Sequence, residues 1–418
     1  MSRRGAVVAG ALLALLLTAG GCSSVPPHLE LPALQMGDPS FRATLVAYTG
    51  NAVVSGNRVE VLLNGDQIFP AKIAAIRAAR KSITYAQYVF EEGQPAIDTA
   101  QALAERCRAG VPVHVLLDAV GALAMPTQYL AWMTEAGCKV VFYHPLNPWS
   151  LDRVNERNHR RILVVDGTVG FTGGSGTSGK WSGNGREDGY WRDTDVRVQG
   201  PVVEQLQGAF VESWLEATGV ALGGPAYFPR PIPVKGGVDA HVVRSSPAGG
   251  SAAMYTMFLL AMASARRSIY ITNPYFVPDE KMVETLIQAR QRGVRVVLLL
   301  PGAIDHNLVR QASRGGFGRL LKEGVEIHEY KPALLHAKTM VIDSMWSTVG
   351  STNLDRRSFA LNEELNLVIY DAGVAKRLEE VFEKDLSEST RVTYQRWANR
   401  GIVSRVLEWL AVPVRDQL

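Results

Sequence analysis

The chain of 418 residues is 47% hydrophobic and 20% charged, with a formal net charge of +4. This is the composition of a folded globular protein with room for two domains, and it excludes a wholly disordered chain and a multi-span membrane protein. The small excess of positive charge does not indicate a nucleic acid as the partner.

The first 21 residues differ from the rest of the chain. Arg3 and Arg4 precede an uninterrupted run of apolar and small residues that ends at Cys22, which is the layout of a secretory signal. The small residues before the cysteine resemble a bacterial lipobox, with Ala19 where a leucine is usual. We therefore expect residues 1–21 to be a lipoprotein-type signal peptide and Cys22 to be lipidated. A plain cleaved signal and an uncleaved anchor are the alternatives.

Such a signal would direct export of the protein. Its cleavage after residue 21 would remove two arginines and lower the net charge to +2. The resemblance implies a chain that is lipid-anchored to the bacterial membrane on the periplasmic side, and Ser23 favours the outer membrane. In that oxidising compartment Cys107 and Cys138 could form a disulfide, or each could be a small buried residue. The spacing of Cys and His does not indicate a zinc site.

Two halves of the remaining chain repeat each other in the same order. AARKSITYAQYVF at 78–90 matches SARRSIYITNPYF at 264–276, and RAGVPVHVLLD at 108–118 matches QRGVRVVLLLP at 291–301. Equivalent residues lie roughly 180 positions apart, which is far too long for a stacked repeat. The sequence therefore predicts a duplicated domain.

Each copy alternates helical segments with near-continuous Val, Ile and Leu strands, which favours a sheet covered on both faces. We predict an α/β fold of two tandem, pseudo-symmetric α/β/α sandwich lobes. The segments that follow the signal peptide are an N-terminal linker at 22–56, a first lobe at 57–218, a Gly- and Pro-rich linker at 219–237, a second lobe at 238–390 and a C-terminal amphipathic helix at 391–418.

The C-terminal run alternates basic and apolar residues at helical spacing. It is either a helix packed on the core or an interfacial helix with one polar and one apolar face. In the second case arginines would face lipid headgroups and large apolar residues would face acyl chains, namely Arg396, Arg400 and Arg405 on one side and Trp397, Leu407, Trp409 and Leu410 on the other.

An octapeptide occurs once in each copy, as HRRILVVD at 159–166 and as HAKTMVID at 336–343. In an extended strand, residues two apart share a face, so the histidine and the following cation project together. The candidate pairs are His159 with Arg161 and His336 with Lys338. A histidine beside a fixed cation is suited to hold an anion.

The aspartates Asp166 and Asp343 end the two octapeptides. They are seven residues from the histidines, so we expect them on the other face or in the turn beyond, in a supporting role. A turn of small residues follows each aspartate, and its backbone N–H groups and polar side chains would suit phosphate oxygens. The candidate phosphate-binding residues are Gly173, Gly174, Ser175, Gly350, Ser351 and Asn353.

These motifs resemble the phospholipase D superfamily, whose signature is HxKx4D followed by GSxxN or GGxN. The second copy matches it, whereas the first has Arg161 in place of lysine and Gly176 in place of asparagine. Arginine keeps the positive charge and adds a planar fork. The surroundings of both motifs are similar to bacterial cardiolipin synthases over roughly residues 57–412.

The resemblance implies a two-step displacement at phosphorus, without a metal or another cofactor. His159 would be the nucleophile and His336 the general acid and base, although the two roles could be exchanged. Arg161 and Lys338 would neutralise the phosphate oxygens. By the same resemblance, Asp195 and Glu364 would each orient the histidine of the opposite half, which places the active site between the two lobes.

Two further aromatic sets have open interpretations. Tyr88 and Tyr275 occupy equivalent places and either pack in the core or line the cleft. The loop at 178–192 has no counterpart in the second copy and is either a surface insertion or a membrane contact through its large aromatic side chains, which are Trp181, Tyr190 and Trp191.

The predicted activity is phosphatidyl transfer that makes cardiolipin from phosphatidylglycerol and a second phospholipid, at a membrane surface. A phospholipase D hydrolase shares the same local motifs. A secreted phosphodiesterase acting on nucleic acid is disfavoured by the low charge. A catalytically inactive lipid-binding protein would be expected to lack a motif histidine, and both are present. The oligomeric state is left open.

Overall fold

The computed structural model describes residues 29–145, 155–187, 189–247, 252–302 and 307–411. The predicted signal peptide, Cys22 and the end of the predicted C-terminal helix lie outside these ranges. The elements below belong to one compact unit, Leu31–Leu418. Within the described ranges, no helix is both long enough and apolar enough to cross a membrane.

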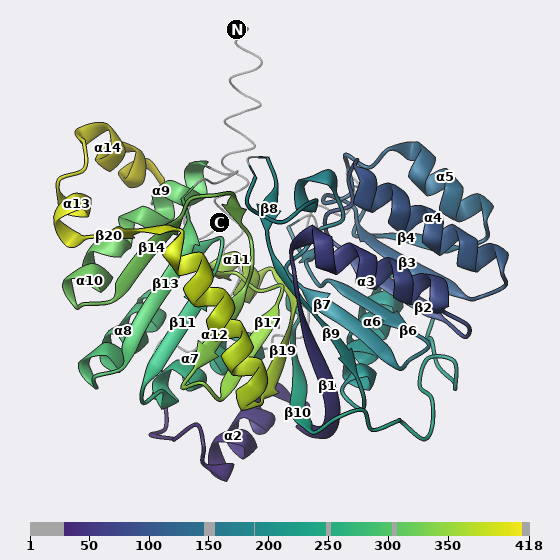
Figure 1. Ribbon diagram of the computed structural model, residues 1–418, viewed down its shortest axis with the longest axis horizontal. Helices are drawn as coiled ribbons and strands as arrows, with labels where there is room; N and C mark the ends of the chain where they lie inside the picture. Colours follow the sequence, from purple (N-terminus) through teal and green to yellow (C-terminus); the bar gives the residue numbers. More distant parts are fainter. Residues whose placement is uncertain (1–28, 146–154, 188, 248–251, 303–306, 412–418) are drawn as a thin grey trace, which may run out of the picture. The chain divides into compact units, whose positions relative to one another are not determined.

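The first lobe contains the strands of one half of a large sheet and the helices that cover them (Figure 1). Its elements in chain order are β1 (Val54–Leu63), α3 (Asn64–Ala78), β2 (Ile83–Gln87), α4 (Gln94–Arg108), β3 (Val113–Asp118), α5 (Thr127–Glu135), β4 (Lys139–Tyr143), β5 (Arg157–Asn158), β6 (Ile162–Val165), β7 (Val169–Gly173), the 3-10 turn η2 (Gly179–Trp181), β8 (Trp191–Arg192), β9 (Thr194–Gln199) and α6 (Val203–Thr218).

The second lobe repeats this plan and adds elements at its end. Its elements are β10 (Val238–Ser245), α7 (Ala253–Ser264), β11 (Ser268–Thr272), β12 (Phe276–Val277), α8 (Glu280–Gln291), β13 (Arg295–Pro301), α9 (Asn307–Gly315), α10 (Phe317–Lys322), β14 (Glu326–Tyr330), β15 (Leu334–Leu335), β16 (Thr339–Ile342), β17 (Trp346–Gly350), β18 (Leu354–Asp355), α11 (Arg356–Ala360), β19 (Asn362–Tyr370), α12 (Ala372–Ser387), β20 (Ser389–Val392), α13 (Tyr394–Ala398) and α14 (Ile402–Ala411).

The two lobes share one sheet. Outward from the centre, the first lobe runs β1-β9-β7-β6-β2-β3-β4 and the second runs β10-β19-β17-β16-β11-β13-β14, with β20 added at its edge. The orders are the same in both lobes, as duplication predicts. Strands β1 and β10 pair antiparallel and join the halves, so the lobes are continuous rather than separate sandwiches.

Helices cover both faces of the sheet because its strands are apolar on both sides. In the first lobe, α3 and α4 pack with β2 and β3 around Ile76, Leu103 and Val115. The cluster on the α6 side extends through both lobes, from Phe210 to Leu378 of α12. This shared core fixes one lobe against the other.

Two of the predicted boundaries need correction. Residues within the expected linker at 22–56 form helix α2 (Pro39–Thr49), because Phe41 and Leu45 are fully buried and Arg42 pairs with Asp239. The expected single C-terminal helix is a short strand followed by two helices, α13 and α14. The break falls at Gly401, where helix propensity is low.

Two short strands cross from one lobe to the other. Strand β5 pairs in parallel with β19, and β15 pairs in parallel with β8. Each of the crossing strands β5 and β15 ends immediately before a motif histidine, His159 or His336. These two pairings therefore carry each histidine to the opposite lobe.

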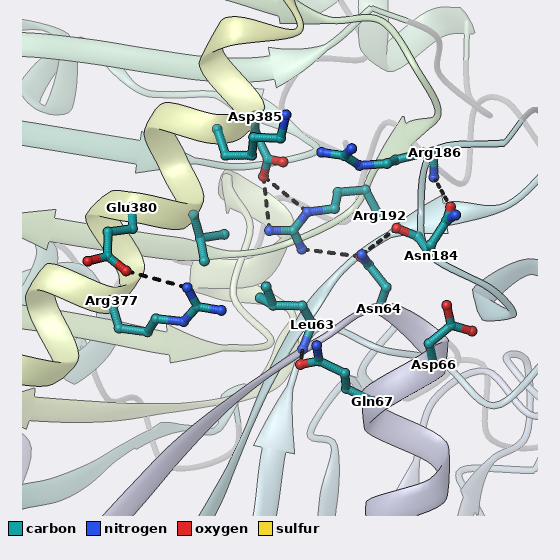
Figure 2. Close-up of a pocket in the computed structure, with 12 residues that line it drawn as sticks. Leu63, Asn64, Asp66, Gln67, Asn184, Arg186, Arg192, Arg377, Glu380 and Asp385 are labelled. Atoms are coloured by element: carbon teal, nitrogen blue, oxygen red, sulfur yellow. Dashed lines mark hydrogen bonds and ion pairs between the residues drawn. The ribbon is translucent and has the colours of Figure 1, made fainter.

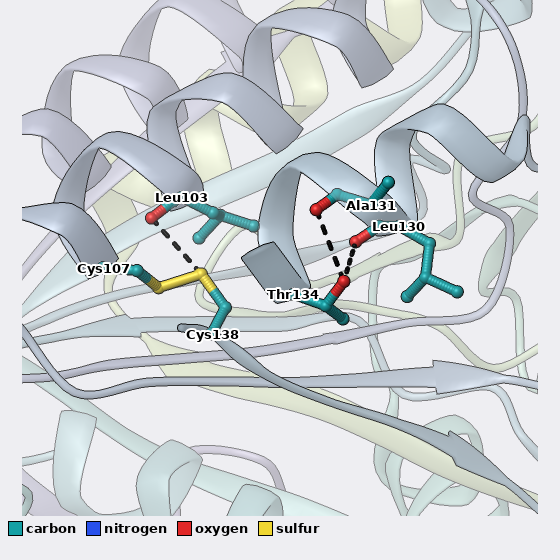
Figure 3. Close-up of a disulfide and its surroundings, with 6 residues drawn as sticks. All are labelled: Leu103, Cys107, Leu130, Ala131, Thr134 and Cys138. Atoms are coloured by element: carbon teal, nitrogen blue, oxygen red, sulfur yellow. Dashed lines mark hydrogen bonds between the residues drawn. A yellow bond between two sulfur atoms is a disulfide. The ribbon is translucent and has the colours of Figure 1, made fainter. Parts of the chain in front are cut away.

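Cys107 and Cys138 form a disulfide between the end of α4 and the start of β4 (Figure 3). Their Cα atoms are 5.5 Å apart, and Cys138 follows Cys107 by 31 positions in the sequence. In the chain-entropy model, closing a loop of this length stabilises the folded state by about 4 kcal/mol. The sequence left open whether these cysteines are bonded or are separate small buried residues, and in the structure they are bonded.

Candidate active site

His159 lies at the lobe boundary with its ring held from the second lobe. Its backbone N–H donates to the carbonyl of Glu363 at 2.9 Å, and its Nδ1 is 2.8 Å from Oε1 of Glu364. Arg161 approaches the other ring nitrogen, with Nη2 3.0 Å from Nε2. The imidazole is also contacted edge-on by Tyr88, so this tyrosine lines the site.

His336 has the mirror arrangement with the first lobe. Its backbone N–H donates to the carbonyl of Arg192 at 2.7 Å, and its Nδ1 is 2.7 Å from Oδ2 of Asp193. Nζ of Lys338 is 2.9 Å from Nε2 of the same ring. Tyr275, the equivalent of Tyr88, lies farther away, with ring centroids separated by 6.4 Å.

The two motifs therefore meet, and each histidine shares a face with its cation as predicted. Arg161 also lowers the pKa of His336 across the boundary, and Lys338 lowers that of His159. Only 7% of His159 and 4% of His336 are exposed. The result is an enclosed site between the lobes with a cation beside each histidine.

The carboxylate beside His336 is Asp193, and the predicted Asp195 is wrong for this contact. Asp195 lies two residues farther along, within β9, where its Oδ2 is 2.6 Å from Nζ of Lys72. It also accepts hydrogen bonds from the N–H and hydroxyl of Ser175. Asp193 occupies the one-residue break between β8 and β9, which frees its side chain to face the second lobe.

A finer alignment of the two copies identifies this residue. Glu364 follows Asp193 by 171 positions, and Asn366 follows Asp195 by the same number. Gly173 pairs with Asp195 in the first lobe, and Gly350 pairs with Asn366 in the second. Asp193 is thus the equivalent of Glu364, whose predicted contact with His159 is confirmed.

Backbone N–H groups of the turns after the motifs are hydrogen-bonded within the protein. The N–H of Gly174 donates to Thr194, and that of Ser175 donates to Asp195. In the second copy, the N–H groups of Gly350 and Ser351 donate to the carbonyls of Lys338 and Leu365. All four donors thus have a partner within the protein, and phosphate binding by these turns stays a prediction.

Of the six predicted phosphate-binding residues, Asn353 keeps an unused polar group. Its Oδ1 is buried and has no hydrogen-bond partner among the described residues. A buried polar atom without a partner is costly and often indicates a place for a ligand or water. Asn353 is therefore the turn residue best suited to meet a substrate.

Asp166 and Asp343 have the expected supporting role. Both adopt left-handed backbone conformations beyond the strand, with φ of 53° and 54°. Each carboxylate accepts hydrogen bonds from backbone N–H groups at the start of the neighbouring strand in the sheet, β2 or β11. The donors are Arg80, Lys81 and Ser82 in the first lobe and Arg266, Arg267 and Ser268 in the second. They fix the start of β2 and β11 and do not touch the histidines.

Trp181 is part of the site rather than a membrane contact. It is 1% exposed, and its Nε1–H donates to Oδ2 of Asp193 at 2.8 Å. Its ring lies against His336 and fills the space beside Gly176, where a Cβ would be only 2.6 Å from the indole. This explains why Gly176 stands where the second copy has Asn353.

The two carboxylates that contact the histidines, Glu364 and Asp193, differ in pKa. Burial raises the pKa of Glu364 to about 7, against the hydrogen bond from Ser351 and the charge of Arg161. Burial would also raise the pKa of Asp193, but His336, Lys338 and the hydrogen bond from Trp181 outweigh it and hold that pKa below its ordinary range. Asp193 is therefore the more firmly ionised carboxylate.

The surroundings of both histidines favour the neutral imidazole. Burial, and then Arg161, hold the pKa of His159 well below its usual range, and burial and Lys338 lower that of His336 to about 3. An anion placed between the cations would oppose these effects and favour protonation. The site can thus offer a nucleophilic imidazole and take up a proton when an anionic ligand binds.

A pocket at the lobe boundary contains Arg192, the residue that precedes Asp193 (Figure 2). This cavity of about 320 Å³ lies between α3 and α12. Its wall includes Arg192, which reaches across the boundary to a buried ion pair with Asp385, 2.9 Å away. Because Arg192 immediately precedes Asp193, the ion pair positions the aspartate that contacts His336.

The described residues contain no group of three or more His, Cys, Asp or Glu placed to hold a metal ion. The polar groups at the site are instead the paired histidines, cations and carboxylates. They could bind a singly charged phosphodiester and attack it from one side while protonating the leaving group from the other.

Comparison with known families identifies one model that matches both lobes. It is described as the phospholipase D-like domain of cardiolipin synthase and matches residues 73–214 and 259–386. Cardiolipin synthase 1 of Bacillus cereus is 32% identical over 369 residues, which are 86% of this chain and 72% of that protein. A probable cardiolipin synthase of Bacillus subtilis is 33% identical over 356 residues, covering 85% and 71%.

Among solved structures, the fold is similar to that of phosphatidylserine synthase from Haemophilus influenzae. The TM-score is 0.71 with 12% sequence identity, and the match covers 91% of this chain and all of that one. Polyphosphate kinase from Porphyromonas gingivalis is similar with a TM-score of 0.53 and 11% identity, covering 94% and 57%. At such low identity these similarities show the fold alone.

The raised pKa of Glu364 predicts a pH-dependent effect of Glu364→Gln on stability. Between 4.5, the ordinary pKa, and about 7, the folded protein holds a proton that the unfolded chain has released. Native stability therefore falls by up to roughly 3 kcal/mol as the pH rises through this window. Glutamine does not ionise, so the Tm of the variant should rise relative to the native Tm over the same window.

Thermal unfolding measured at several pH values checks this expectation. The control is Glu380→Gln, which removes an exposed carboxylate on α12 and should leave the Tm difference constant. A Tm difference for Glu364→Gln that is flat or decreasing between pH 4.5 and 7 would contradict the burial argument.

Proposed function

The chain belongs to the phospholipase D-like cardiolipin synthases, and we propose that it transfers a phosphatidyl group between phospholipids through a covalent histidine intermediate. The observation that carries this mechanism is the crossed pairing at the site. His159 is held by Glu364 and His336 by Asp193, each through Nδ1. Both Nε2 atoms are thereby left for chemistry beside a cation.

In the first step, Nε2 of His159 attacks the phosphorus of the donor lipid. The bond from phosphorus to the headgroup oxygen breaks, and the Nε2–H of His336 gives its proton to that oxygen. A phosphatidyl group is then bonded to His159, and the headgroup leaves as an alcohol. Separating the reaction at this point replaces one difficult displacement by two easier ones.

In the second step, the hydroxyl of a second phospholipid enters where the headgroup left. His336 removes its proton, the alcohol oxygen bonds to phosphorus, and the bond to His159 breaks. The product is a lipid with two phosphatidyl groups, and both histidines return to their starting states. Arg161 and Lys338 stabilise the negative charge on the phosphate oxygens in both steps.

The assignment of roles follows from the two carboxylates. A general acid must be protonated when the donor is bound, and an ionised carboxylate at Nδ1 favours its imidazolium form. Asp193 is the more firmly ionised of the pair, which supports His336 as the acid. Glu364 then orients His159 for attack.

Transfer is favoured over hydrolysis by the enclosure of the site. His159 and His336 are 7% and 4% exposed, and aromatic side chains contact both rings. A site that excludes bulk water protects a phosphorylated intermediate from hydrolysis until the second lipid arrives. We propose phosphatidylglycerol as the donor, in line with relatives named for the synthesis of cardiolipin.

For location, we propose export, with Cys22 as the lipid-anchored residue. The apolar run before Cys22 supports a secretory signal. The disulfide between Cys107 and Cys138 supports an oxidising compartment such as the periplasm. Labelling of growing cells with a radioactive fatty acid tests the anchor, and Cys22→Ser should remain unlabelled.

The activity is tested by incubating the purified chain with phosphatidylglycerol vesicles and resolving the lipids by mass spectrometry. We expect cardiolipin and glycerol in equal amounts, because the acceptor is a second lipid. His159→Ala and His336→Ala should each form neither product. Phosphatidic acid without cardiolipin would contradict transfer and identify a hydrolase.

The covalent step is tested with a phosphatidyl donor whose leaving group is p-nitrophenolate, which does not need a proton. His336→Asn should release one equivalent of nitrophenolate rapidly and retain a phosphatidyl group on His159, located by peptide mass spectrometry. His159→Asn should give neither. An adduct on His336 in the His159→Asn variant would show that the roles are exchanged, and no adduct in either variant would contradict the intermediate.

A further inference from the structure

The C-terminal helices carry large apolar side chains that the protein does not bury. On α14, Ile402 is 78% exposed and Trp409 is 71% exposed, while Leu407 is 44% exposed. Ile402 and Trp409 are seven residues apart, so two helical turns place them on the same face. Tyr394 on α13 is also exposed, at 45%.

Another face of α14, the one that carries Glu408, is packed against the rest of the protein. Glu408 is 6% exposed and forms an ion pair of 2.6 Å with Arg400. The Arg400 guanidinium stacks on Trp397, whose Nε1–H donates to the carbonyl of Arg314 at the end of α9. The apolar residues of α14 are therefore held outward by a rigid base, and their exposure is not the result of a loose helix.

The segment that contains α13 and α14 has an excess of positive charge. Residues 391–411 contain four arginines and a single carboxylate, Glu408, which is already paired with Arg400. Arg396 and Arg405 are exposed, and no ion pair within the described ranges involves either of them. A helix surface with exposed apolar and cationic residues together is suited to a bilayer of anionic lipids.

The segment is connected to the active site through α9. Helix α14 packs against α9, and α9 in turn packs against β12. Val309 and Ala312 of α9 pack on Val277 of β12 and on Tyr275. Tyr275 is in turn one of the aromatic residues near His336, at 6.4 Å between ring centroids. Helix α14 is thus connected through α9 to the surroundings of the motif histidine of the second lobe.

We infer that α13 and α14 form a docking surface for an anionic phospholipid bilayer, with Ile402 and Trp409 entering the interface and Arg396 and Arg405 meeting headgroup phosphates. The inference rests on the proposed function, because lipid substrates must leave a bilayer to reach the buried histidines. Docking here would bring the lipid surface to the side of the second lobe that carries α9. It assigns a role to a segment that takes no part in the chemistry.

The test uses a local fluorescent probe in the full chain, because the N-terminal apolar segment could bind vesicles by itself. Cys22→Ser leaves the disulfide cysteines as the only others, and Trp409→Cys is then labelled with a polarity-sensitive dye. The matched control is Tyr48→Cys, an exposed aromatic position on α2, which lies at the opposite edge of the unit from α14 in Figure 1. Vesicles of phosphatidylglycerol and of phosphatidylcholine are compared.

We expect a blue shift at position 409 with phosphatidylglycerol vesicles, a smaller one with phosphatidylcholine, and none at position 48. No shift at 409 on vesicles that retain the protein would overturn the inference. A blue-shifted signal that is present before vesicles are added would also overturn it, because another segment or a second copy would then cover the helix.

Activity separates this inference from the proposed function. The variant Ile402→Ser/Trp409→Ser should lose most of its turnover on vesicles and keep native turnover in detergent micelles, where docking is not required. Equal turnover of variant and native protein on vesicles would contradict docking. Insertion at position 409 in a protein that makes no cardiolipin in either medium would refute the proposed function and leave the docking surface standing.

Discussion

The hydrogen bond between each catalytic imidazole and a carboxylate of the opposite lobe is the contact on which this structure depends. Neither lobe contains a complete histidine and carboxylate pair, so the site exists only when both are in register. The crossing strands β5 and β15 provide that register, because each ends just before a motif histidine. Strand β5 pairs with β19, which contains Glu364, and β15 pairs with β8, which ends just before Asp193. The continuous sheet, the shared core and the buried ion pair of Arg192 with Asp385 keep the register fixed.

Duplication produced a symmetric frame that the two halves complete differently. Glu364 receives a second hydrogen bond from the hydroxyl of Ser351, whereas Asp193 receives it from the indole of Trp181. Glycine at 174 stands where the second copy has Ser351, and a Cβ there would lie 2.2 Å from Asp193. The two carboxylates also differ in ionisation, because burial raises the pKa of Glu364 whereas His336 and Lys338 hold that of Asp193 below its ordinary range. Such a difference is what a reaction with one nucleophile and one acid requires.

Much of the fold and the centre of the site could be predicted from the sequence, because the repeated octapeptides and apolar strands are local patterns with a fixed spacing. His159, Arg161, His336 and Lys338 were identified in this way. The errors arose where tertiary contacts decide. Asp195 lies within a strand and looked like the partner, yet the break in the sheet before it frees Asp193 instead. The role of Trp181 depends on a loop that folds back over the site, and no periodic pattern indicates it.

The most direct test of the crossed pairing compares turnover of Asp193→Asn and Asp195→Asn. If Asp193 stabilises the imidazolium of His336, its replacement should lower kcat by roughly 10²- to 10⁴-fold. Asp195→Asn should retain most activity, because its equivalent in the second copy is already Asn366, which holds the hydroxyl of Thr352. Comparable losses in both variants, or a greater loss for Asp195→Asn, would contradict the account.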